Sequence, residues 1–177
     1  MISKSLTKLA VLVTFILSVS SISAQNFTLE KSDILVEGTS NIHDWEMEGN
    51  KAQGTLVAEN GNITSIKVQI PTESLDSGKG GMNKNAFEAL KSDDNPNITF
   101  KSKNVTDKKV TGILQIAGQQ KTVTIPFTTS ETNQQITVKG KKTVNMTHYG
   151  VEPPTALMGT IKTGEEVTIN FEFNFKQ

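Results

Sequence analysis

The residues best suited to chemistry stand together in the segment NIHDW at 41–45, which holds one of the two histidines, an aspartate and the only tryptophan. A histidine beside a carboxylate is a common general base. If the segment is a strand, however, its side chains alternate, so His43, Trp45 and Met47 share one face. Asp44 then lies on the opposite face and cannot orient His43 as a triad acid does. We therefore expect His43 and Trp45 to point inward and Asp44 to face water.

The rest of the sequence contains no recognisable catalytic or metal-binding motif. His148, in MTHYG at 146–150, is expected in a loop, and its spacing from His43 matches no metal-binding motif. The chain has no cysteine, which excludes disulfides, thiolate nucleophiles and cysteine-ligated zinc. A Walker A loop, a dinucleotide-binding fingerprint and a G-x-S-x-G elbow are absent. We predict no catalytic residue, no metal and no cofactor.

The stretch GKGG at 78–81 precedes an expected helix. The exposed N–H groups of a helix start, together with Lys79 or Lys84, suit an anionic head group. A flexible entry loop with ordinary glycines is the alternative, because the spacing of a phosphate-binding loop is missing.

The charge pattern argues against nucleic acid as a partner. The 18 basic residues balance 18 acidic ones, and every basic residue is lysine. Without arginine, the chain has no planar fork for bidentate recognition of phosphate or guanine. The lysines are scattered and form no basic stripe.

The first 24 residues have the three parts of a secretory signal peptide. Lys4 and Lys8 are followed by an apolar run at 9–19, and a stretch of small residues ends near Ala24. The run is shorter than the ~20 residues that a membrane-spanning helix needs. We predict signal peptide 1–24 and one domain, 25–177, without a transmembrane anchor, in the periplasm or outside a bacterial cell. The lack of cysteine favours bacterial export over a disulfide-rich eukaryotic source.

A period of two dominates the remaining sequence. In VTINFEFNF at 167–175, Val167, Phe171 and Phe175 belong to an apolar set that alternates with polar residues. Similar short segments, separated by turn signals, indicate an antiparallel barrel or sandwich. The exception is 82–91, where apolar residues follow a helical stripe that ends before Asn95-Pro96. One short helix in an all-β chain suggests a lid at one end.

Three longer stretches together resemble the YceI-like family of exported lipid-binding proteins. They are NPNITFKSKNV at 95–105, VTGILQIAGQQKTVTIPF at 110–127 and YGVEPPTALMGTIKTGEEVTINFEF at 149–173. The resemblance implies a lipocalin-like antiparallel β-barrel of about eight strands with one short helix at the opening. It also implies an apolar tunnel that binds isoprenoid chains, quinones or related amphiphiles without chemistry.

Carried over to this sequence, the resemblance implies a set of tunnel residues that adds to His43, Trp45 and Met47. These are Phe87, Leu90, Phe100, Val110, Leu114, Val123, Ile125, Phe127, Val167, Ile169, Phe171 and Phe173. Many members carry an Arg-Asp pair before the helix, whereas this chain has no arginine. A neutral or amide head, or a quinone ring, therefore suits the lysine-only loop better than a diphosphate does.

Three classes of function stay open at this point. The first is non-catalytic binding of a polyisoprenoid, isoprenoid quinone or fatty-acid-like chain in the cell envelope. The second is a packed barrel that serves as a structural or interaction module without a ligand, because an eight-stranded barrel also permits a filled interior. The third is an enzyme in which His43 or His148 acts as a general base. The sequence leaves a homodimer open as well.

Overall fold

The computed structural model of the chain describes residues 24–132 and 134–177. The predicted signal peptide lies outside this part of the chain except for Ala24, where the first strand begins. No helix among the described residues is long and apolar enough to span a bilayer.

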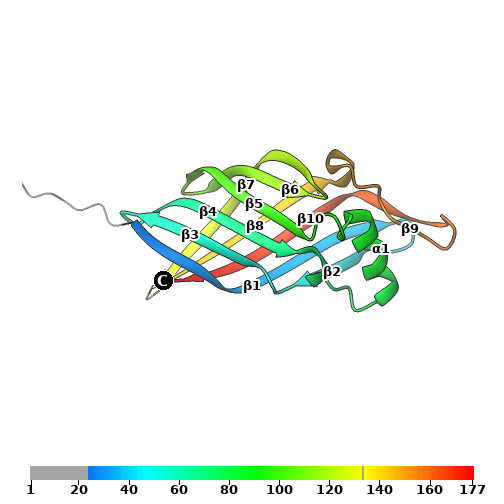
Figure 1. Cartoon of the computed structure of the whole chain (residues 1–177), viewed down its shortest axis with the longest axis horizontal. Coiled ribbons are helices and arrows are strands. Elements are labelled where there is room, and N and C mark those ends of the chain that lie inside the picture. The colour runs from blue at the N-terminus through cyan, green and yellow to red at the C-terminus, as the bar shows by residue number, and fades with distance from the viewer. Residues whose placement is uncertain (1–23, 133) are drawn as a thin grey trace, which may run out of the picture.

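The described chain is an elongated antiparallel β-barrel (Figure 1). Its strands are β1 (Ala24–Ser40), β2 (Trp45–Gly49), β3 (Gln53–Glu59), β4 (Asn62–Pro71), β5 (Asn97–Thr106), β6 (Lys109–Ile116), β7 (Gln119–Thr132), β8 (Gln135–Asn145), β9 (Thr155–Ala156) and β10 (Ile161–Lys176). The helical segments are η1 (Thr72–Ser74), α1 (Gly80–Leu90) and η2 (Met146–Tyr149). Pairing of β1 with β10 closes a barrel of eight strands, which confirms the predicted fold class.

Two short strands share one edge of β1. The first residues of β1 pair with β3, and residues 34–38 pair with β2. Between these pairings, the buried hydroxyl of Ser32 accepts a hydrogen bond from the N–H of Ala52 at 3.1 Å. Among the described residues, the far edge of β2 is paired only at Glu48, whose backbone exchanges two hydrogen bonds with Asp76. The segment that carries η1 and α1 therefore covers the edge of β2.

Helix α1 begins two residues earlier than the sequence predicts and ends one residue earlier. Lys91 adopts a left-handed conformation with φ of 54°, and its N–H bonds the carbonyls of Phe87 and Glu88. This is a common way to end a helix. Pro96 follows shortly after and directs the chain into β5.

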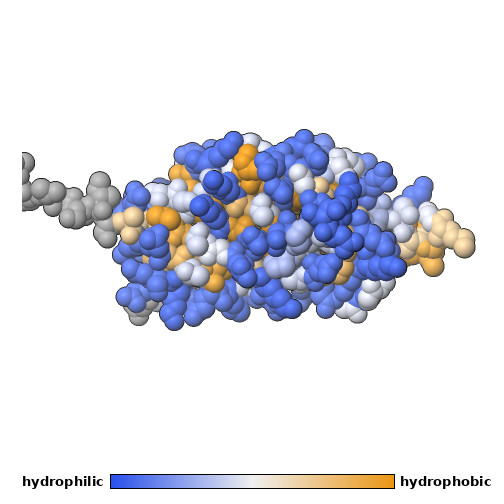
Figure 2. Space-filling view, in the orientation of Figure 1, coloured by the Kyte–Doolittle hydropathy of each residue, from blue (hydrophilic) through white to orange (hydrophobic). Residues whose placement is uncertain are grey.

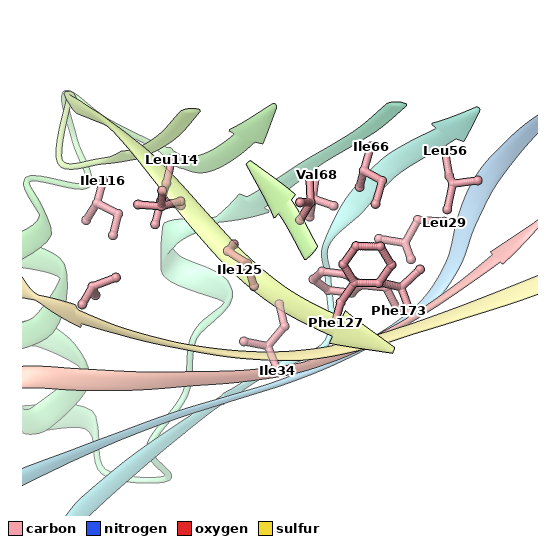
Figure 3. Packing of buried hydrophobic residues seen from close by; sticks show 14 of the residues in the cluster. Leu29, Ile34, Leu56, Ile66, Val68, Leu114, Ile116, Ile125, Phe127 and Phe173 are labelled. Carbon is pink, nitrogen blue, oxygen red and sulfur yellow. The ribbon is translucent and has the colours of Figure 1, made fainter. Parts of the chain in front are cut away.

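Inward-facing side chains of the strands form one apolar core (Figure 3). Phe27, Leu56 and Phe175 are at most 2 % exposed. The rings of Phe173 and Phe175 meet edge to face with centroids 6.4 Å apart. We call the part of the interior around Phe27, Leu56 and Phe175 the packed half. It also contains Leu29, Ile66, Ile136 and Phe173.

Candidate functional site

An apolar cavity of about 490 Å³ lies beneath α1, at the end of the barrel that also carries β9 (Figure 1). We call it the main cavity and this end of the barrel the hollow half. Its volume falls within the roughly 300–1,000 Å³ of small-molecule sites. Apolar lining residues are Val36, Trp45, Met47, Leu75, Met82, Ala86, Ala89, Leu90, Ile98, Ile116, Val144, Met146, Tyr149, Val151, Pro154, Ala156, Ile161, Val167 and Ile169. Polar lining residues include Ser40, His43, Lys79, Asn85, Thr155 and Thr163.

A second, smaller space of about 80 Å³ lies deeper in the barrel, and we call it the inner cavity. Ile98 and Ile169 line both cavities, so the two spaces adjoin. Its other lining residues are Ile34, Ile66, Val68, Ile70, Thr99, Phe100, Val110, Leu114, Ile125, Phe127, Val138, Lys142, Phe171 and Phe173.

Trp45 begins β2 and lines the main cavity. Its indole N–H donates to the carbonyl of Thr39 at 3.0 Å, which satisfies the polar edge of the ring. The ring lies against Gly38, its register partner in β1, where a Cβ atom would overlap with it. The missing side chain of Gly38 therefore makes room for the indole in the cavity wall.

His43 lies in a turn rather than in the expected strand. The carbonyl of His43 accepts hydrogen bonds from the N–H and the hydroxyl of Ser40, and these bonds reverse the chain before Trp45. His43 is exposed and lines the mouth of the main cavity. Its Nδ1 lies 2.7 Å from the backbone oxygen of Asp44, not from the carboxylate. Asp44 is exposed and does not line the main cavity.

The remaining predicted tunnel residues fall into four groups. Met47, Leu90, Val167 and Ile169 line the main cavity, as Trp45 does. Phe100, Val110, Leu114, Ile125, Phe127, Phe171 and Phe173 line the inner cavity. Val123 is buried in the core and lines neither space. Phe87 lies on the side of α1 away from the main cavity, against an outer groove that also contacts Leu75 and Glu73.

The two lysines proposed for a head group are separated by the helix. Lys79 lines the mouth of the main cavity. Lys84 is exposed on the opposite side of α1, and its ammonium lies 3.8 Å from the carboxylate of Glu88. The structure therefore brings only Lys79 to the cavity.

A polar network occupies the loop before α1. The carboxylate of Asp76 accepts from the N–H of Gly78 at 2.8 Å and from the side-chain amide of Asn83 at 2.7 Å. Ser77 donates to the carbonyl oxygen of the Asn83 side chain. The hydrogen bond from Asn83, followed by the one from Gly78, lowers the pKa of Asp76. The glycine-rich loop thus already holds an anion of its own, which opposes binding of a second one there.

Tyr149 lines the main cavity and was missed by the sequence interpretation, which placed its segment in a loop. The residue is 3 % exposed, and its hydroxyl has no hydrogen-bond partner within residues 24–132 and 134–177. Burial raises the pKa of this hydroxyl. The side-chain oxygen of Asn145 accepts from the N–H of Thr147, and this cap begins the η2 turn that brings Tyr149 inward.

The cavity mouth is flanked by two loops that are joined through Asn41. Its side chain accepts from the N–H of Lys162 and donates to the carbonyl of Thr160. The exposed large apolar residues of the described chain are Ile42, Leu157 and Met158. They lie on these two loops, and the loop after β9 forms the apolar tip at the right of Figure 2.

Within the described residues, no three histidine, aspartate or glutamate side chains gather in a way that would hold a metal ion. Among the described residues that line the main cavity, the ionisable side chains are His43 and Lys79, and both lie at its mouth. The main cavity is therefore suited to enclosing an apolar molecule, and it offers few groups for acid–base chemistry.

Comparisons with known proteins agree with this geometry. The family model described as the YceI-like domain matches residues 18–175. The solved structure of BcnA from Burkholderia cenocepacia is 21 % identical, with a TM-score of 0.69 over 81 % of this chain and 95 % of that one. A polyisoprenoid binding domain from Saccharophagus degradans is 11 % identical, with a TM-score of 0.67 over 85 % and 97 %.

A YceI protein from Campylobacter jejuni is 13 % identical, with a TM-score of 0.60 over 100 % of this chain and 99 % of that one. No curated protein sequence matches the chain significantly. At these identities the solved structures establish the shared fold, and the family model establishes the family.

Proposed function

This chain belongs to the YceI-like family, and from that membership and the main cavity we propose that it binds and carries an amphiphilic lipid without catalysing a reaction. The observation that carries the proposal is the apolar space of about 490 Å³ inside the barrel. A packed interaction module has no use for such a space, because unfilled volume in a core costs stability.

The chemistry of the cavity wall indicates the class of ligand. Aliphatic side chains, three methionines and one indole suit a flexible hydrocarbon chain, which gains roughly 0.8 kcal/mol for each CH₂ removed from water. We propose a polyisoprenoid, isoprenoid quinone or fatty-acid-like chain as the occupant. A diphosphate head is disfavoured, because the chain has no arginine and Asp76 places a carboxylate beside the glycine-rich loop.

The enzyme alternative finds little support in the geometry of His43. Its ring nitrogen contacts a backbone oxygen, and the neighbouring carboxylate of Asp44 lies outside the main cavity. The backbone oxygen can hold the ring in one tautomer, but it carries no full charge to stabilise a protonated imidazole as a triad carboxylate does. We therefore propose a carrier in the bacterial cell envelope, exported through the signal peptide predicted at 1–24.

The test uses Trp45, the only tryptophan. Titration with an isoprenoid alcohol such as farnesol should shift its fluorescence emission, because the indole forms part of the cavity wall. Trp45→Ala should weaken binding measured by calorimetry, whereas Asp44→Asn should leave binding and stability nearly unchanged. Absence of binding to the wild-type protein, together with no lipid in native mass spectra of protein from its own host, would remove the carrier proposal.

A further inference from the structure

Lys142 occupies an inward-facing position of β8. The residues that face the interior along this strand are Ile136, Val138, Gly140 and Val144, and Lys142 continues the same alternation. The outward positions carry Lys139 and Lys141, which are exposed. Lys142 is half-buried and lines the inner cavity.

The position of Lys142 is the junction of the two cavities. Its register partner on β10 is Ile169, which lines both spaces. The next inward residue of β8, Val144, lines the main cavity. The lysine therefore lines the inner cavity beside its boundary with the main cavity, whereas His43 and Lys79 lie at the mouth of the main cavity.

The surroundings of Lys142 contain no counter-charge. It is the one charged residue among those that line the inner cavity, and Thr99 is the one other polar residue there. Within residues 24–132 and 134–177, no ion pair or side-chain hydrogen bond involves Lys142. A charge that is taken out of water is costly unless it is paired.

We propose that Lys142 is the anchor for a singly charged acidic head, so that a fatty acid or isoprenoid acid binds head-first with its chain in the main cavity. This inference rests on the proposed function. One ammonium is balanced by one carboxylate, whereas a diphosphate brings more charge than a single lysine neutralises. A neutral head would leave the ammonium without a counter-ion when the cavity fills.

The decisive comparison uses palmitate and hexadecanol, which share a chain and differ at the head. Lys142→Met keeps an unbranched side chain that is one atom shorter and removes the charge. It should weaken palmitate binding by about 10- to 100-fold, the loss expected for a charge-assisted hydrogen bond. It should change hexadecanol binding by less than about threefold. The matched control Lys79→Met removes a lysine at the mouth and should affect neither ligand strongly.

A second readout separates an ion pair from a change in cavity shape. In wild-type protein, the carboxyl pKa of bound ¹³C-labelled palmitate should lie lower than in Lys142→Met, because the ammonium favours the carboxylate. Equal pKa values in the two proteins, or loss of palmitate binding in Lys79→Met instead, would overturn the head-first arrangement. If hexadecanol binds but palmitate gains nothing from Lys142, only this inference fails. If neither ligand binds wild-type protein, the carrier proposal fails with it.

Discussion

The same two long strands, β1 and β10, build both the packed half and the hollow half of the barrel. In the packed half they bring Leu29 opposite Phe175 and Ser32 opposite Phe173. In the hollow half they bring Val36 opposite Ile169 and Gly38 opposite Val167. The inward set thus changes from phenylalanine to valine and isoleucine along one strand.

This difference shows that alternation and volume are separate properties of a strand. Alternation decides which side chains point inward, and it is the same in both halves. The summed volume of the inward side chains decides whether the interior is filled, and an eight-stranded barrel is close to that limit. In the hollow half small side chains and a covering helix leave space, and the packed half has large rings.

Replacement of leucine by alanine should give the largest difference in stability between the two halves. Leu56 is 0 % exposed in the packed half, and Leu56→Ala should lower the free energy of unfolding by about 3–5 kcal/mol. Leu90→Ala makes the same deletion beside the existing main cavity and should cost only about 1 kcal/mol, because little new cavity surface is created. Urea denaturation of both variants measures the difference. Equal losses would mean that the two halves are equally well packed.

Gly38→Ala should disturb the hollow half alone. The added Cβ atom would overlap with the ring of Trp45, so the indole must move at a cost of about 1–3 kcal/mol. The emission maximum of the single tryptophan reports the movement. Gly80→Ala is the matched control, because its Cβ atom would meet nothing within 4 Å. An unchanged spectrum in Gly38→Ala would show that the indole does not rest on this glycine.

Tyr149→Phe, in the hollow half, should raise the stability of the fold instead of lowering it. The hydroxyl is buried without a partner in the described part of the chain, so its removal should stabilise the fold by about 1 kcal/mol. Thermal denaturation without ligand measures this gain. A loss of stability instead would reveal a bound water or another partner at the hydroxyl.

The smallest effect is expected for the loop that anchors α1 over the hollow half. Asn83→Ala removes the main hydrogen bond to the carboxylate of Asp76, so the pKa of Asp76 should rise toward its ordinary value of 3.8. Because folding lowers this pKa, the carboxylate contributes stability above pH 3.8 that is lost as the pH falls through the folded-state pKa. NMR titration of the Asp76 carboxyl carbon measures the shift. An unchanged pKa would assign the effect to Gly78 alone.

Several parts of this architecture followed from the sequence. The alternation in β10 predicts the inward set from Val167 to Phe175, and the structure places these side chains along the interior. The apolar stripe at 82–91 predicts the helix, because its apolar residues recur at helical spacing and not at every second position as in a strand. Order and spacing of three stretches indicated the family, which the family model confirmed.

Other features were decided by tertiary structure, for reasons that a one-dimensional pattern does not contain. Phe87 and Leu90 belong to one apolar stripe in the sequence, yet only Leu90 lines the main cavity, because the placement of α1 over this cavity selects the face. Lys142 looked like one of many scattered lysines until strand pairing placed it opposite Ile169.

The cavity itself is the volume that the elements leave between them, so it depends on strand tilt and on where α1 and η2 come to lie. Alternation along β1, β8 and β10 assigns each side chain a direction. It carries no information about how far apart the elements lie. The sequence by itself therefore determined which residues face inward. Only the folded barrel decided which of them pack together and which of them surround a space.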